Sequence, residues 1–116
     1  MNRRILYYGN YYIDFYSKQD DKTKRKIDFV LDLIRKVDWV PIKFLKYLEG
    51  TDELYEIRVA TISKSVRILC FFDEGKLVIL LNCFVKKTNK TPKEEIERGM
   101  KLKKEYFADK MRWNRK

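Results

Sequence analysis

Apolar residues recur along this chain with two different periods, which together predict a sheet covered by helices. After residue 21 they return every three or four positions, as in an amphipathic helix: Ile27, Val30, Leu31, Ile34 and Val37. Three later segments, 54–62, 65–72 and 77–85, have the alternating or continuous apolar pattern of strands. The last of them is apolar almost throughout, which is typical of a strand covered on both faces.

Further elements are predicted near the two ends of the chain. Residues 3–8 favour a strand, and the spacing of residues 11–16 is compatible with a short helix. Residues 91–94 (Thr-Pro-Lys-Glu) have the composition of a helix start, and an apolar stripe follows over residues 96–107. Residues 41–50 are predicted to be a connector. The pattern therefore predicts four strands and three helices in one domain, 1–116.

The loop between the predicted strands 54–62 and 65–72 determines how two arginines lie relative to each other. Residues 63–64 suit a tight hairpin turn, although no glycine specifies its type. If Ile62 lies opposite Ser65, then Arg58 and Arg67 lie on the same face of the sheet as diagonal neighbours. The two guanidinium groups are then within reach of one phosphate.

Charge adds an expectation about partners. The chain has 27 basic and 17 acidic residues, a formal net charge of +10. Residues 86–116 hold 12 of the basic and 5 of the acidic residues, a balance of +7, so the excess is concentrated after the last strand. Such a surface favours an anionic partner, whether nucleic acid, an acidic protein or a lipid surface.

Several classes of chemistry are excluded by what the sequence lacks. There is no histidine, no phosphate-binding loop among four glycines, and no metal-ligand spacing around Cys70 and Cys83, which we expect to be reduced packing residues. Neither a metal nor a cofactor is expected. The first residues lack the apolar core of a leader, and no segment reaches the ~18 apolar residues of a membrane span, so we expect a cytoplasmic protein without a membrane partner.

The remaining candidate chemistry is a cluster of cations on and after the strands. Its centre is predicted to be Arg58, Arg67, Lys86 and Lys87, with Lys43, Lys46 and Lys90 at its margins. A solvated sheet face that prevents edge pairing is an equally simple interpretation. However, Arg67 lies in an otherwise apolar strand, where it needs an anion or open solvent, and Glu56 is available for a structural salt bridge.

Aromatic side chains are abundant, with eight tyrosines and seven phenylalanines. Such rings can stack on RNA bases, and Tyr106 is a candidate for this role. Its helical spacing from Ile96 and Lys103 favours packing against the sheet instead.

Several strings of residues also follow one another in a recognisable order: Phe44–Gly50, Leu54–Arg58, Val66–Leu69, Phe71-Phe72, Phe84–Thr88, Lys90–Pro92 and Glu95-Ile96. In this order and spacing, from about residue 40 to 106, the chain resembles the RelE/ParE superfamily of toxins from type II toxin-antitoxin systems, and specifically its HigB-like, phage-related branch. The Lys-Lys-Thr and Lys-Thr-Pro strings are the most specific part of the resemblance.

The resemblance implies a small α+β domain. In it, helices pack on one face of a twisted, mostly antiparallel sheet of about four strands, and a C-terminal helix follows. It further implies a metal-independent, ribosome-dependent endoribonuclease that cuts mRNA in the ribosomal A site, contacts ribosomal RNA, and is inhibited by a helix-turn-helix antitoxin. In such enzymes the ribose 2′-hydroxyl attacks the adjacent phosphate.

Carried over residue by residue, the resemblance assigns roles to the cation cluster. Arg67 matches the arginine that holds the scissile phosphate, Arg58 matches a basic position on the preceding strand, and Lys86 and Lys87 match basic residues after the last strand. The general base stays open between Glu56 and a lysine whose pKa is depressed by nearby cations. Residues 82–83 (Asn-Cys) depart from the His-Gly of many relatives, so any role of that histidine is lost.

Two other functions stay open at this point. ParE-like relatives share the fold but act on gyrase and lack the nuclease residues, which the retention of Arg58, Arg67 and the lysine pair argues against. The second is a non-catalytic module that binds RNA or the antitoxin.

Overall fold

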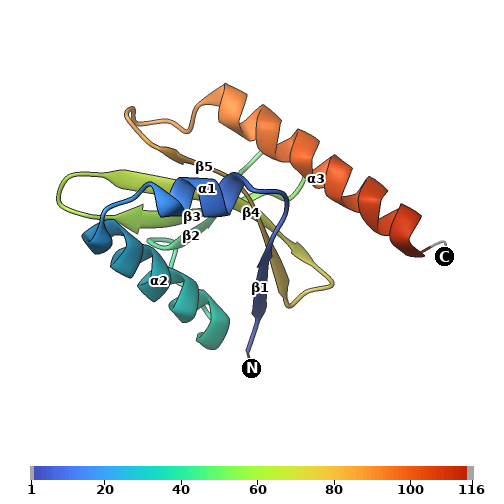
Figure 1. Ribbon diagram of the computed structural model, residues 1–116, viewed down its shortest axis with the longest axis horizontal. Coiled ribbons are helices and arrows are strands. Elements are labelled where there is room, and N and C mark those ends of the chain that lie inside the picture. The colour runs from blue at the N-terminus through green and yellow to red at the C-terminus, as the bar shows by residue number, and fades with distance from the viewer. Residues whose placement is uncertain (1, 115–116) are drawn as a thin grey trace.

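The computed structural model describes residues 2–114; residues 1, 115 and 116 of the predicted domain lie outside the described range. Eight elements follow in the order β1 (Arg4–Tyr7), α1 (Tyr11–Ser17), α2 (Asp21–Lys36), β2 (Leu45–Tyr47), β3 (Tyr55–Ala60), β4 (Ser65–Asp73), β5 (Leu77–Val85) and α3 (Lys93–Asn114) (Figure 1). The strands form one sheet in the order β1-β5-β4-β3-β2. Among the strands of residues 2–114 only β1 and β5 run parallel, so the predicted small α+β fold with a mostly antiparallel sheet is confirmed.

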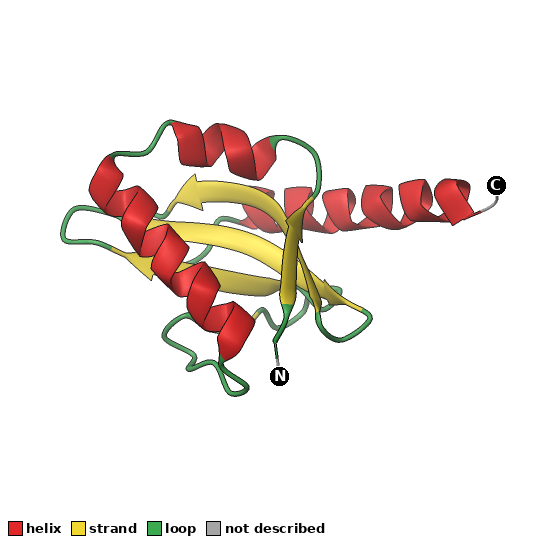
Figure 2. Cartoon of the chain, turned by 60° about the horizontal axis from the view of Figure 1, so that its bottom comes forward, coloured by secondary structure: helices red, strands yellow, loops and turns green. Residues whose placement is uncertain are grey.

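Helices cover both faces of this sheet, not one as expected. Helices α1 and α2 lie on one face and α3 crosses the other, extending past the edge of the strands (Figures 1 and 2). The alternation of side chains explains the division: Ile57, Ile68 and Leu80 pack with α2, whereas Leu69 and Leu81 pack with Leu102 of α3. Each face therefore has its own apolar core.

Helix α2 forms where the amphipathic pattern predicted it. Asp20 caps its first turn by accepting a hydrogen bond from the Thr23 N–H at 2.7 Å. The stripe of Ile27, Val30 and Ile34 is fully buried against the sheet, while the charged residues between them face outward. The outer face of α2 thus keeps its basic side chains available.

The prediction that residues 41–50 form a connector is wrong in one respect, because this segment contains a fifth strand. Residues 45–47 form β2, which pairs antiparallel with residues 55–57 of β3. The segment is too short to show a period of two, so only its pairing reveals it as a strand.

The predicted hairpin register is also wrong, by two residues. Ala60, not Ile62, lies opposite Ser65, and residues 61–64 form a longer loop. This loop is held by the Thr61 N–H, which donates to the Lys64 carbonyl at 2.9 Å, and by the Lys64 N–H, which donates to Thr61 Oγ1 at 3.1 Å. A shift of two residues keeps every side chain on its predicted face.

Candidate functional site

The corrected register places the two strand arginines directly opposite each other. Arg58 of β3 and Arg67 of β4 are Cα partners, and both point to the α3 face of the sheet. Two like charges at this position repel each other unless an anion lies between them. The structure supplies that anion from β3 itself, two residues before Arg58.

Glu56 is the buried counter-charge of the cluster. Its side chain is only 1% exposed, and Oε1 accepts a hydrogen bond from Arg58 Nε at 3.2 Å and lies 3.4 Å from Arg67 Nε. The second oxygen, Oε2, accepts a hydrogen bond from the hydroxyl of Thr91. Both oxygens are therefore engaged from inside the protein, so Glu56 orients the arginines and is poorly placed to take a proton from a substrate.

Arg67 retains unused capacity for an anion. Its Nε is buried and lacks a hydrogen-bond partner among residues 2–114, although Nη1 donates to the Val66 carbonyl at 3.1 Å. Burial lowers the pKa of this guanidinium, with Glu56 opposing and Arg58 adding to the shift. Because Nε faces Glu56 Oε1 at 3.4 Å, a phosphate oxygen would be bound by the rest of the Arg67 guanidinium group.

Lys86 follows β5 and joins the cluster from the other side. Its N–H donates to the Ser65 carbonyl at 2.7 Å, which extends the sheet beyond Val85 and fixes the residue beside β4. Burial lowers the pKa of the Lys86 ammonium, and Arg67 lowers it further while Glu56 opposes the shift. The shift at Lys86 has the direction that a lysine general base requires.

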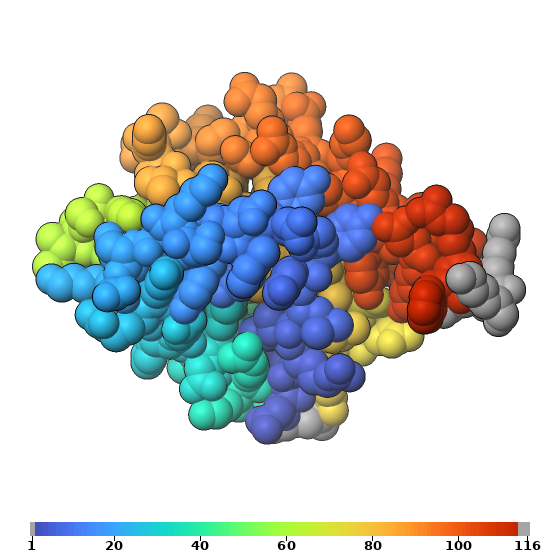
Figure 3. Space-filling model, in the orientation of Figure 1, coloured from blue at the N-terminus to red at the C-terminus, as the bar shows by residue number. Residues whose placement is uncertain are grey.

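Three further lysines of the predicted cluster have different surroundings. Lys46 of β2 is the Cα partner of Glu56, and its charge contributes to the lowered pKa of Lys86. Lys87 lines a pocket with Lys86 and the β3–β4 loop, and the loop and residues 86–92 form one flank of the molecule (Figure 3). Lys90 is exposed in the segment between β5 and α3.

Lys43 shares a second pocket with the arginine pair. This pocket of about 380 Å³ is lined by Lys26, Lys43, Phe44, Arg58, Ala60 and Arg67. Four of the six lining residues are cations and none is acidic. Lys26 of α2 and Thr91, before α3, were not among the predicted site residues. Neither contact has a local sequence signal, because each joins segments far apart in the chain.

Tyr106 is a predicted site residue that the structure places away from the arginine pair. Its hydroxyl donates to Asp73 Oδ2 at 2.7 Å, at the far end of β4 from Arg67, and its ring packs edge-on against Phe71 and Tyr8. Hydrogen bonding and packing thus account for it. Tyr106 therefore packs against the sheet, which is the alternative that its helical spacing favoured.

The start of α3 is held in place by Asn82. This side chain is 2% exposed, and its Nδ2 donates to the Glu95 carbonyl at 3.0 Å and to Glu95 Oε1 at 2.9 Å. The pairing of β4 and β5 shifts by one residue between Ile68 and Cys70, which brings Asn82 to the α3 face. Asn82 therefore anchors the helix and, through it, Thr91.

The two cysteines lie away from this chemistry. Both are free thiols, as expected, and burial raises the pKa of Cys83 to about 12 and also raises that of Cys70. Within residues 2–114, no group of three or more His, Cys, Asp or Glu side chains is placed to hold a metal ion.

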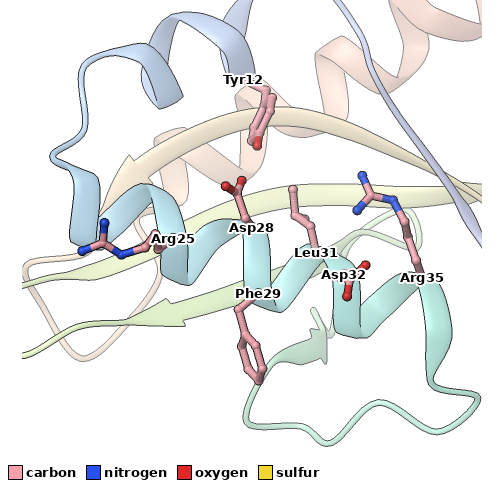
Figure 4. A pocket seen from close by; sticks show the side chains of 7 residues that line it. All are labelled: Tyr12, Arg25, Asp28, Phe29, Leu31, Asp32 and Arg35. Carbon is pink, nitrogen blue, oxygen red and sulfur yellow. The ribbon is translucent and has the colours of Figure 1, made fainter.

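Another pocket, of about 590 Å³, lies between α1 and α2. Tyr12 points into it from α1, and α2 contributes Arg25, Asp28, Asp32 and Arg35 among its lining (Figure 4). Two arginines and two aspartates balance each other in charge. A polyanion is therefore attracted to the Arg58 and Arg67 side of the molecule and not to this pocket.

Comparison with known proteins identifies the family of the chain. The model of the family described as Phage derived protein Gp49-like (DUF891) matches residues 14–104, which include every element from α2 to β5 and the first half of α3. The chain belongs to this family. It is a RelE/HigB-type, toxin-like family. No curated protein matches the chain. No helix within the described range is long and apolar enough to pass through a bilayer.

Proposed function

We propose that this Gp49-like protein is the toxin of a type II toxin-antitoxin system and cleaves mRNA on the ribosome without a metal ion. One observation carries the proposal. Arg58 and Arg67 are directly opposed on one face, share a single buried carboxylate, and have beside them a lysine with a lowered pKa. This combination suits phosphate binding together with proton transfer.

The arginine pair holds the scissile phosphate. Arg67 contributes a fixed charge, and Arg58 approaches from the facing strand. As the 2′-oxygen forms its bond to phosphorus, the extra negative charge on the phosphate oxygens is stabilised by both guanidinium groups. Glu56 and Thr91 keep the two guanidinium groups in position, so both act as positioning residues.

Two lysines handle the protons. The amine of Lys86, with its lowered pKa, takes the proton from the 2′-hydroxyl while the 2′-oxygen attacks phosphorus. The bond from phosphorus to the 5′-oxygen breaks, and the ammonium of Lys87 protonates this leaving oxygen. The products are a 2′,3′-cyclic phosphate and a free 5′-hydroxyl.

The surrounding charge supports binding to the ribosome. The net charge of +10 and the lysines at positions 43, 46 and 90 around the site favour contacts to ribosomal RNA phosphates. An affinity for ribosomes that does not fall with salt would contradict this part of the proposal. An antitoxin with a helix-turn-helix domain is the expected inhibitor.

The test maps new mRNA 5′ ends after induction of the chain in bacteria, on a translated transcript and on a copy without its start codon. Wild type should cut only the translated copy, in register with codons, and Arg67→Ala should lose at least a hundredfold of this cutting. Arg25→Ala is the matched control, since Arg25 is exposed on α2 outside the site. Growth arrest without cuts would favour a gyrase-directed toxin. The absence of any effect on growth would favour a non-catalytic binding module.

A further inference from the structure

The pocket beside the arginine pair combines positive charge with an aromatic surface. Lys26 and Lys43 extend the positive charge beyond Arg58 and Arg67, and Phe44 contributes a ring to the same lining. We propose that this pocket binds the nucleotide next to the cut phosphate, with its base on Phe44 and its phosphate between Lys26 and Lys43. This inference rests on the proposed nuclease function and assigns a specific subsite to it.

The pocket exists because β2 is short. Pairing along this edge of the sheet stops with the hydrogen bond from the Arg58 N–H to the Phe44 carbonyl, at 2.8 Å. Ala60 lies beyond that point, and its small side chain forms part of the pocket lining. Lys26 belongs to α2 on the opposite face, yet it lines the same pocket. The site is thus continuous from the α3 face around the edge of the sheet, along a path that a single strand of RNA can follow.

Phe44 belongs to an aromatic pair flanked by cations. Its ring lies 6.4 Å from that of Phe29 at an interplanar angle of 72°, and Phe29 is 53% exposed. Lys43 Nζ lies 5.4 Å from the centre of the Phe44 ring, and Lys26 Nζ lies 5.3 Å from that of Phe29. In proteins that bind single-stranded nucleic acids, partly exposed rings stack on the bases and neighbouring lysines bind the phosphates.

The size and charge of the pocket fit one nucleotide. Its volume of about 380 Å³ lies within the range of small-molecule sites, about 300–1,000 Å³. Glu56 offsets a single positive charge of the arginine pair, so Lys26 and Lys43 remain available for a second phosphate. The four cations therefore suit two phosphates, and the Phe44 ring suits the base between them.

The binding test uses a fluorescent RNA hexamer of random sequence in which every 2′-hydroxyl is methylated, so that no cleavage can occur. Fluorescence anisotropy is measured over a series of salt concentrations. Lys26→Ala should weaken binding about fivefold and reduce the slope of log K against log salt by about 0.7, the value for one phosphate contact on a single strand. Phe44→Leu should weaken binding about fivefold and leave the slope unchanged, because stacking releases no counterions.

Two variants act as controls. Lys24→Ala removes a lysine of the same helix that lies over Tyr16, outside the pocket, and should leave affinity and slope as in wild type. Phe44→Tyr keeps the ring and should restore binding. Thermal unfolding of each variant shows whether it is folded. If Lys26→Ala and Phe44→Leu bind the hexamer as Lys24→Ala does, or wild type does not bind it, the proposal is overturned.

A cleavage measurement separates this inference from the proposed function. On ribosomes carrying defined mRNAs, Phe44→Leu should still cut but with a changed base preference beside the cut. Unchanged sites and rates in Phe44→Leu and Lys26→Ala would overturn the subsite and leave the nuclease in place. If wild type does not cut at all, the nuclease proposal fails, whereas the hexamer comparison still decides whether the pocket binds a nucleotide.

Discussion

Replacing Glu56 with glutamine is the sharpest test of how the site is held together. Glutamine keeps the shape of the side chain and can still accept a hydrogen bond, but it removes the negative charge between Arg58 and Arg67. In the native structure the carboxylate is 1% exposed and lies 3.2 Å and 3.4 Å from the two Nε atoms. The variant therefore leaves two opposed arginines, with Lys86 nearby, without their counter-charge.

The magnitude follows from the burial of the partners. Removing one member of a fully buried ion pair costs about 3–5 kcal/mol of unfolding free energy. Arg58 and Arg67 retain 26% and 12% exposure of their side chains, so water offsets part of this cost. We expect Glu56→Gln to lose about 2 kcal/mol. The variant should also gain more stability from added inorganic phosphate than wild type does, since an anion replaces the lost charge.

The assay is urea unfolding followed by far-ultraviolet circular dichroism, with and without phosphate. Glu53→Gln is the matched control, because Glu53 is exposed three residues earlier and should change the unfolding free energy by less than about 0.5 kcal/mol. If Glu56→Gln is as stable as Glu53→Gln and gains nothing from phosphate, the carboxylate does not hold the arginines and our reasoning is refuted.

Three further predictions concern protonation and packing. Because burial and nearby arginines lower the pKa of Lys86, cleavage on ribosomes should rise with pH in wild type but not in Lys86→Arg, whose guanidinium stays charged; identical pH profiles would contradict this role. Burial by itself would raise the pKa of Asp73, but its hydrogen bonds from Lys110 and Tyr106 and the charge of Lys110 together lower it. The ionised Asp73 therefore stabilises the fold above about pH 4, and this stabilisation is lost as pH falls through the lowered pKa. In urea unfolding, Asp73→Asn should lose about 2 kcal/mol of unfolding free energy at neutral pH. Its unfolding free energy should also depend less on pH in the acid range than that of wild type. In Gly99→Ala the new Cβ would lie 3.0 Å from Leu69 Cδ1, so we expect a lower unfolding temperature despite the better helix propensity of alanine; a higher one would show that the α3 contact can relax.

Local pattern predicted most of the fold because each long element has a clear period. The stripe of α2 and the apolar runs of β4 and β5 are long enough to be recognised without a partner. The strand β2 was missed because its three residues form a strand only through pairing with β3. The position of α3 on the second face likewise depends on contacts across the sheet, which the sequence does not display.

For the site, the sequence alone determined which side chains share a face. Alternation with a period of two places Arg58 and Arg67 on the same side, and this result survived a hairpin register that was wrong by two residues. The residue types also limited the chemistry to fixed cations, lysines and one carboxylate, since the chain has no histidine.

Only the tertiary structure decided how those groups are paired and protonated. Thr91 meets Glu56 across 35 residues, and Lys26 reaches the arginine pocket from the opposite face of the sheet. The lowered pKa of Lys86 arises from burial and from charges on three other strands. Hydrogen bonds, ion pairs and desolvation depend on distances in space, and these distances exist only once strands and helices far apart in the chain have packed together.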